Sequence, residues 1–206
     1  AARRREVDRI TVDAAWSYAQ NKDRGATNAS SSGYVTTQRR VGGGLKYDYY
    51  LSDRSYALAT TRVLGDTIAN LELRYTAGAG IGYTLIDDGK DLFLFEAGLS
   101  YLNESYRDLS AFPANAPSSV DYLAARIAYR YEHPLSDQTK LVHRAEAFPS
   151  LEDKDDFYCQ VTTEVSTSLT DSMIATVTHV LDYDNTPSFG FKRADNRVVL
   201  SVGWSF

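Results

Sequence analysis

The sequence predicts an all-β protein, specifically an up-and-down antiparallel transmembrane β-barrel. Three observations support this fold class. Apolar and polar residues alternate with period two over segments longer than ordinary strands. No run of about 18 apolar residues exists, which excludes a transmembrane helix. The final segment alternates in the same way and ends in an aromatic residue. Membrane-crossing strands have this texture, with an average hydropathy that resembles that of a soluble protein.

The clearest predicted strand runs from Leu71 to Leu85. Its odd-numbered positions are Leu, Tyr, Ala and Ile, and its even-numbered positions are Glu, Arg, Thr and Gly. A strand in a soluble protein is typically about 5–6 residues long, whereas a bilayer-crossing strand needs about 9–11. The length of this alternation therefore favours a membrane strand.

The same pattern recurs along the chain and gives ten visible strands in one domain spanning residues 1–206. The other strands are predicted at Ile10–Tyr18, Arg40–Tyr49, Phe93–Tyr101, Leu123–Glu132 and Cys159–Leu169, with weaker ones near 55–64, 140–150 and 172–184 and a last one near 196–206.

The predicted connections alternate between short and long. Short turns are expected at Ser52–Arg54, Asp87–Lys90, Pro134–Gln138 and Thr170–Ser172. Longer or more polar loops are expected at Asn21–Gly33, Gly65–Asn70, Asp108–Ser119, Glu152–Asp156 and Asp184–Asp195. Outer-membrane barrels of Gram-negative-type bacteria show this asymmetry, with short periplasmic turns and longer outer loops. This asymmetry places both ends of the chain on the periplasmic side, which requires an even number of strands.

Composition excludes several other classes. The net charge is -5 and no long basic run exists, so we expect no nucleic-acid partner. The single cysteine, Cys159, rules out an intrachain disulfide and lies on the apolar face as an inert small side chain. A lipocalin-like barrel or a β-sandwich has an apolar interior, which conflicts with a face this rich in Arg and Glu because burying those charges is costly.

The polar faces of the predicted strands gather charges of both signs, which we expect to line the lumen. A barrel of 10–12 strands is only somewhat wider than one that side chains just fill. This favours a network of Arg–carboxylate pairs filling the interior over a narrow polar pore. The predicted lumen residues are Asp13, Arg40, Lys46, Asp48, Glu72, Arg74, Glu96, Arg126, Arg130, Glu132, Arg144, Glu146, Glu164 and Arg197.

The chain ends in a strand whose apolar residues share one face. This pattern resembles the signal by which the barrel assembly machinery recognises outer-membrane barrels for insertion. Its aromatic residues suit the membrane–water interface. The predicted signal residues are Val198, Leu200, Val202, Trp204 and Phe206.

The chain resembles the salt-induced outer-membrane protein family, whose biochemical function is not defined. The matching stretches are GGLKYDYYLSDR at 43–54, ANLELRYTAGAGIGYTLID at 69–87, LFLFEAGLSYLNESY at 92–106, HRAEAFPSLEDKDDF at 143–157 and LDYDNTP at 181–187, together with the last strand. Family members usually have a further upstream hairpin with a Gly-Asn-Thr turn. The resemblance therefore implies about twelve strands, with Arg3–Asp8 as the tail of that hairpin.

The sequence offers no catalytic or metal-binding motif. The histidines His133, His143 and His179 are scattered over three strands, and none forms an identifiable sequence motif with a nearby Ser or Asp. The acidic loops Glu152–Asp156 and Asp182–Asn185 lack the spacing of a calcium loop, so we expect them to be solvated charge. We expect no enzyme activity, no metal and no cofactor.

The sequence thus favours an integral outer-membrane protein with a structural or envelope-stress role. The alternatives are a narrow diffusion pore for small polar solutes and a structural subunit of an envelope assembly that binds a protein partner. The expected partners are outer-membrane lipid and lipopolysaccharide, and the assembly machinery through the C-terminal strand. The sequence leaves open which segment pairs with the last strand.

Overall fold

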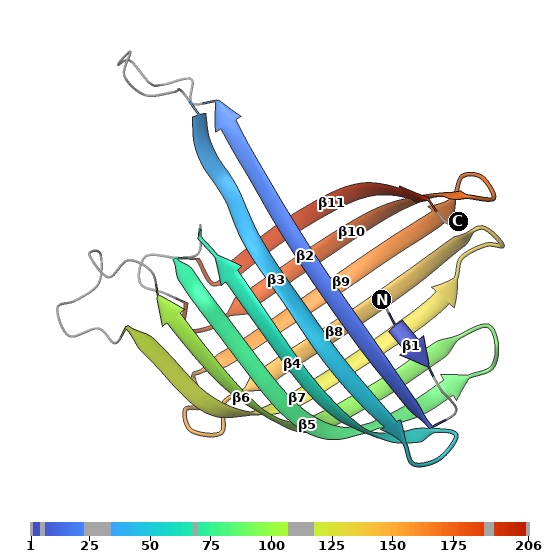
Figure 1. Cartoon of the computed structure of the whole chain (residues 1–206), viewed down its shortest axis with the longest axis horizontal. Helices are drawn as coiled ribbons and strands as arrows, with labels where there is room; N and C mark the ends of the chain where they lie inside the picture. Colours follow the sequence, from blue (N-terminus) through green and yellow to red (C-terminus); the bar gives the residue numbers. More distant parts are fainter. Residues whose placement is uncertain are drawn as a thin grey trace.

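The computed structural model describes residues 2–4, 7–22, 34–67, 70–106, 118–187 and 192–204. These residues form one sheet of eleven strands in which each strand pairs antiparallel with the next along the chain (Figure 1). The predicted all-β, up-and-down antiparallel fold is confirmed. In the part of the chain that the structure describes, no helix is long and apolar enough to cross a membrane.

Ten long strands correspond to the ten predicted ones, and a short first strand precedes them. The strands are β1 (Ala2–Arg4), β2 (Asp8–Lys22), β3 (Tyr34–Tyr50), β4 (Ser55–Asp66), β5 (Leu71–Asp87), β6 (Leu92–Tyr106), β7 (Ser119–Pro134), β8 (Thr139–Pro149), β9 (Phe157–Ser168), β10 (Met173–Asp184) and β11 (Ala194–Trp204). The short β1 pairs with β2 from Arg9 to Thr11. The resemblance places the tail of a preceding strand in this segment.

The sheet curls into a half-barrel, so that β2–β6 cross in front of β7–β11 around a concave interior (Figure 1). The curl brings strands that are distant in the sheet order close together. Among the described residues β11 pairs only with β10, and the edge of β2 pairs only with β1. The pairing that would close the sheet into a full barrel is therefore not made within these residues.

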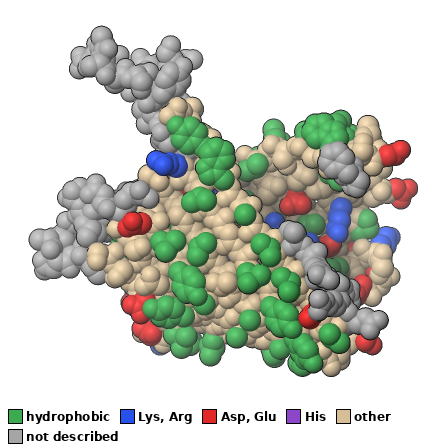
Figure 2. Space-filling model, viewed as in Figure 1, with side chains coloured by type: hydrophobic (Ala, Val, Ile, Leu, Met, Phe, Trp, Pro, Cys, Tyr) green, Lys and Arg blue, Asp and Glu red, His purple; other side chains and the backbone are tan. Residues whose placement is uncertain are grey.

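Strict alternation sorts the side chains onto the two faces. Buried residues such as Leu58, Glu96 and Arg126 point into the concave side. Large hydrophobic side chains point outward from the convex side, where Trp16 is 74% and Ile81 66% exposed. Figure 2 shows hydrophobic side chains spread over the convex face and charged side chains within the hollow. The protein thus has an apolar outside and a charged inside.

Three of the four hairpin turns at one end share a Leu-Ser/Thr-Asp sequence that the sequence analysis did not single out. In the first, the Ser52 hydroxyl accepts hydrogen bonds from the backbone N–H groups of Arg54 (3.3 Å) and Ser55 (3.1 Å). Ser136 and Thr170 make the same contacts in their turns. Ser and Thr favour turns because their hydroxyls satisfy nearby backbone groups. These turns fix the hairpin register.

The remaining hairpin turn at this end, between β5 and β6, uses a different residue pair. Asp88 accepts hydrogen bonds from the backbone N–H groups of Lys90 (2.9 Å) and Asp91 (2.7 Å), and these bonds lower the pKa of its carboxyl. Gly89 has a φ of 80°, in the left-handed region that glycine adopts without steric cost. The turn closes tightly for both reasons.

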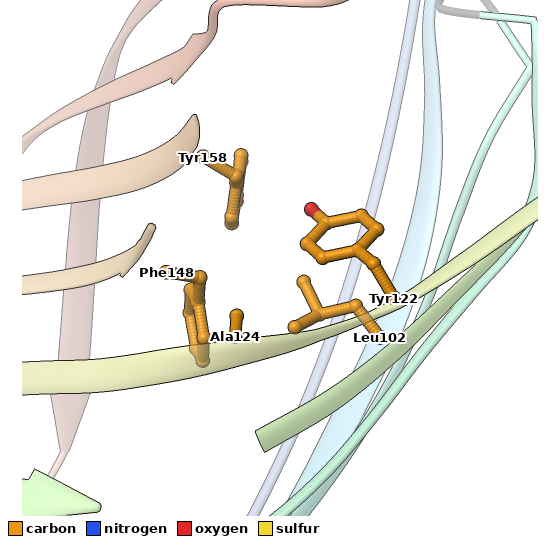
Figure 3. Close-up of a cluster of buried hydrophobic side chains, with 5 residues drawn as sticks. All are labelled: Leu102, Tyr122, Ala124, Phe148 and Tyr158. Atoms are coloured by element: carbon orange, nitrogen blue, oxygen red, sulfur yellow. The ribbon is translucent and has the colours of Figure 1, made fainter. Parts of the chain in front are cut away.

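A small apolar cluster lies inside the curl at the opposite end, where the longer loops are. It consists of Leu102 from β6, Tyr122 and Ala124 from β7, Phe148 from β8 and Tyr158 from β9 (Figure 3). The rings of Phe148 and Tyr158 stack with centroids 6.0 Å apart. This cluster packs the concave face where four neighbouring strands bend around it.

Glycines on the concave face make room for the curl and for large side chains. The ring of Tyr56 on β4 lies directly over its cross-strand partner Gly82 on β5, where an added Cβ would be 2.1 Å from the ring. Gly80 and Gly98 face each other across β5 and β6 with equally little space. Such glycines permit sharp local curvature, and a neighbouring aromatic ring compensates for the missing side chain.

We predict that Gly82→Ala lowers the free energy of unfolding by about 1–3 kcal/mol, since the new methyl group overpacks against Tyr56. Gly203→Ala is the matched control, because nothing lies within 4 Å of its added Cβ, and its effect should stay within about 0.5 kcal/mol. Denaturant unfolding followed by tryptophan fluorescence measures both. Equal stability of the two variants would contradict this packing account.

Candidate functional site

The charged interior is the candidate functional site. All the predicted lumen residues except Glu72 take part in ion pairs there: Asp13, Arg40, Lys46, Asp48, Arg74, Glu96, Arg126, Arg130, Glu132, Arg144, Glu146, Glu164 and Arg197. They lie on β2, β3, β5, β6, β7, β8, β9 and β11. On each of these strands the alternating pattern identified the inward face. The pairs form several groups.

Glu96 on β6 is the centre of the middle group. One carboxylate oxygen accepts hydrogen bonds from Lys46 and from the Tyr56 hydroxyl (2.7 Å), and the other accepts one from Arg126 Nη2 at 2.9 Å. Arg126 also donates to Glu146 at 2.6 Å. Glu96 and Arg126 are only 4% and 5% exposed. A buried carboxylate is tolerated here because several donors satisfy it.

Asp48 on β3 extends this group toward the edge of the sheet. Its side chain is fully buried and pairs with Arg9 at 2.8 Å and with Lys46 at 2.9 Å. Arg9 lies directly opposite Asp48 in the register of β2 and β3. The group therefore ties β2 and β3 to β6, β7 and β8 through side chains alone.

Asp182 on β10 holds the two halves of the curled sheet together across the interior. One of its oxygens accepts hydrogen bonds from Arg40 on β3 at 2.8 Å and from Arg197 on β11 at 2.5 Å. The other oxygen accepts from the Tyr158 hydroxyl at 2.9 Å and from Gln160 at 2.6 Å. Because β3 and β10 are not neighbours in the sheet, the Arg40–Asp182 bridge spans the concave space.

Arg74 on β5 makes a second bridge beside the first. It donates to Glu104 on β6 at 2.7 Å and to Asp184 on β10 at 2.9 Å. Its guanidinium also lies over the ring of Tyr158, 4.1 Å from the centroid, in a cation–π contact. The two bridges narrow the interior near the loop end.

The remaining pairs are more exposed. Arg130 pairs with Glu132 at 2.5 Å, and Lys140 pairs with the same carboxylate. Arg144 and Glu164 are 3.6 Å apart, and Asp13 and Arg62 are 3.4 Å apart. Exposed pairs of this kind contribute roughly 0–1 kcal/mol each.

Two sequence-based assignments are corrected by the structure. Glu72 is exposed and is not part of the network, because the register of β5 against β6 shifts between Leu71 and Leu73. Such a bulge interrupts the alternation, and Leu71 is the buried residue. Asp182 and Asp184 belong to β10 and pair with interior arginines, whereas the sequence predicted solvated loop charge there.

The sequence analysis also missed Arg9, Arg62, Asp66 and Glu104 as interior charges. Period two within the predicted strand near 55–64 indicates the inward facing of Arg62, and a short extension of the neighbouring patterns indicates that of Arg9 and Glu104. Asp66 follows a register shift in β4. Their partners were not predictable from the pattern, since each pair depends on the curl.

Each of the three histidines contacts a different partner. His133 contacts Asp91 at 2.5 Å, His143 contacts Thr163 at 2.9 Å and His179 contacts Asn196 at 3.1 Å. Within the described ranges, no three His, Cys, Asp or Glu side chains form a group that could hold a metal ion. Cys159 is partly buried and lies opposite Ala147 and Tyr183.

The predicted C-terminal signal is exposed on one face of β11. Val198, Leu200, Val202 and Trp204 are 68%, 76%, 55% and 61% exposed. Phe206 lies outside the described residues. The apolar stripe of the last strand is therefore on the convex side and continues the apolar outer face.

Comparisons with known proteins identify a family without an assigned activity. The model of a family described as "Protein of unknown function, DUF481" matches residues 2–206. No curated protein matches the chain. One similar solved structure is titled "CymD monoaromatic hydrocarbon channel", at 8% sequence identity and a TM-score of 0.43, covering 100% of this chain and 72% of that chain.

We predict that Asp182→Asn lowers the free energy of unfolding by about 3 kcal/mol, because removing one partner of a buried ion pair leaves Arg40 and Arg197 without their shared carboxylate. Asp195→Asn is the control, since that side chain is 61% exposed and its change should cost no more than about 1 kcal/mol. Denaturant midpoints compare the two. Similar small losses would show that the interior bridge does not support the fold.

Proposed function

Because the chain belongs to the DUF481 family of unknown function, its role rests on its own structure, and we propose that it is an integral outer-membrane β-barrel protein. In this proposal its charged lumen is largely filled by side chains. It has a structural or envelope-stress role in a Gram-negative-type bacterium and no enzyme activity.

The distribution of polarity between the two faces carries the proposal. The convex face bears exposed Trp16, Ile81 and Leu200, while the concave face buries Asp48, Glu96 and other charges. A soluble barrel needs the opposite arrangement, because water solvates its outside and its core is apolar. Lipid around the convex face would solvate the apolar side chains that water solvates poorly.

Aromatic side chains on the convex face gather toward the two ends of the strands. Tyr75 and Tyr83 on β5 are eight residues apart, or about 26 Å along the strand. Tilted by about 40°, this separation spans about 20 Å of membrane thickness, close to the ~25 Å apolar band of such barrels. Between the two aromatic levels the outward positions are mainly small or aliphatic. They include Ala77, Ala79, Ala97, Leu99, Ala125, Ile127, Ala145 and Ala147.

The aromatic level at the short-turn end is the denser one. The ring of Phe93 contacts those of Tyr129 (6.1 Å) and Tyr131 (6.3 Å), and Tyr131 stacks on His133. Amphipathic rings of this kind favour the headgroup region. We assign this end to the periplasm, with lipid and lipopolysaccharide around the barrel and the β11 stripe as the contact for the assembly machinery.

The salt-induced character of the resembled family suits a structural role under osmotic stress. The bridges from Asp182 and Arg74 brace opposite walls of the barrel and favour a filled lumen. A narrow pore for small polar solutes is the second candidate, and the charges of both signs on the inner face are what such a pore would present to solutes.

A third candidate is a subunit of an envelope assembly. The 11-residue edge strand β11 pairs only with β10 among the described residues, and an edge strand invites pairing with a further strand. In a bilayer the unpaired backbone groups of β11 need such a partner. The upstream hairpin that the resemblance implies is one source of it.

We expect the folded protein in mild detergent to migrate differently on a gel before and after boiling, because a closed barrel resists the gel detergent until it is heated. A sample unfolded in urea beforehand is the control and should migrate as the boiled protein. Identical mobility with and without boiling would count against a membrane barrel.

We also expect no steady conductance when the protein is inserted into a planar lipid bilayer, since the cross-interior pairs occupy the narrow lumen. Boiled protein serves as the control for detergent artefacts. A steady conductance above that of the control would support the narrow pore and overturn the filled-lumen proposal.

A further inference from the structure

The loop end of the interior holds a cavity of about 180 Å³ that adjoins the ion-pair network and shares Glu104 and Asp184 with it. We call it the acidic cavity. It is lined by four carboxylates, Glu104, Asp153, Asp156 and Asp184, together with Tyr122 and Thr186. These side chains come from β6, β7, β10 and the connections that follow β8 and β10.

The acidic cavity carries more negative charge than its surroundings neutralise. Arg74 lies behind it and pairs with both Glu104 and Asp184. Among the described residues no ion pair includes Asp153 or Asp156, and Asp156 accepts a hydrogen bond only from the Thr186 hydroxyl, at 2.6 Å. Among the described residues, Arg74 is therefore the one cation that forms ion pairs with these four carboxylates.

Burial and the nearby carboxylate of Glu104 raise the pKa of the Asp156 carboxyl, although a hydrogen bond from Thr186 opposes the shift. The positive charge of Arg74 opposes this shift without cancelling it. A cation bound beside Asp156 would add a second opposite charge and favour the ionised form.

Tyr122 provides an independent observation. Its side chain is only 5% exposed and lines the cavity, yet within the described residues its hydroxyl has no hydrogen-bond partner. Figure 3 shows the hydroxyl pointing away from Leu102, on the side that faces Tyr158. A phenolic hydroxyl both donates and accepts, so its oxygen can accept a hydrogen bond from a ligand in the cavity.

The size of the cavity and the spacing of its carboxylates favour an organic cation over a metal ion. No three acidic side chains in the described ranges form a group that could chelate a metal. The volume of about 180 Å³ has room for several waters, which a single dehydrated ion would not fill. Tyrosine rings beside the carboxylates also attract ammonium groups through cation–π contacts.

We propose that the acidic cavity binds a small organic ammonium cation, with Asp156, Glu104 and Asp184 accepting from its ammonium groups and Tyr122 accepting through its hydroxyl. This site needs no conducting lumen. It would place a cation-recognition function at the loop end of the barrel.

Isothermal titration of the full chain in detergent with the diamine putrescine tests the proposal. Saturable binding is expected for putrescine and none for 1,4-butanediol, which has the same carbon chain without charge. Equal heats from the two compounds, or none from either, would overturn the proposal. Saturable binding of Mg²⁺ but not of putrescine would instead identify a divalent-cation site and would overturn it as well.

Variants test the assigned residues. Asp156→Asn should weaken putrescine binding by about 3- to 10-fold, since a partly buried ion pair is lost. Tyr122→Phe should weaken it by about 2- to 10-fold, since one hydrogen bond is lost. Asp137→Asn removes the same charge from a turn at the opposite end and should change the affinity less than about 2-fold because of screening. Three equal affinities would show that any binding lies elsewhere. Gel mobility of each variant reports the fold separately, so a failed site and a failed barrel give different results.

Discussion

The pairing of charge inside the curled sheet is the constraint on which the rest of the structure depends. Each long strand presents polar or charged residues to the concave side, and an unpaired charge there would carry a desolvation cost of several kcal/mol. The structure meets this constraint by joining strands that are not neighbours in the sheet. Asp182 alone accepts hydrogen bonds from side chains of β3, β9 and β11.

Glycines on β5 and β6 make these contacts between non-neighbouring strands possible. Gly80 and Gly98 allow β5 and β6 to bend closely past each other, and Gly82 accepts the Tyr56 ring against its backbone. Tyr56 then reaches Glu96 with its hydroxyl. Larger residues at these glycines would keep the walls farther apart. The curvature of the sheet and the ion-pair network therefore depend on each other.

The two ends of the sheet differ in a way that fits two roles. At the short-turn end, hydroxyl-capped turns and clustered outward rings give a compact rim. At the loop end, the bridges from Arg74 and Asp182 stand beside a cavity with excess carboxylate. In this cavity, carboxylates outnumber the arginine that pairs with them. This excess negative charge is the basis of the proposed cation site, whereas the paired charges support the fold.

Period two in the sequence was enough to predict where the ten long strands lie and to place many of the interior charges on the inward face. The reason is physical, since alternation is imposed by strand geometry and does not require knowledge of the partners. It failed at Glu72, where a register shift interrupts the alternation. The pattern also assigned the end of β10 to a loop, because Asp182 and Asp184 resemble the polar loop residues that follow them.

The sequence by itself therefore determined the all-β class, the order of the long strands, the apolar outer face and the charged inner face, whereas several strands extend beyond their predicted bounds. Only the tertiary structure decided which charges meet. Arg40 and Asp182 are 142 residues apart, and the curl of the sheet alone brings them to 2.8 Å. The acidic cavity was likewise decided by the fold. Its carboxylates lie on separate strands and loops, and their excess charge appears only when the curvature gathers them around Tyr122.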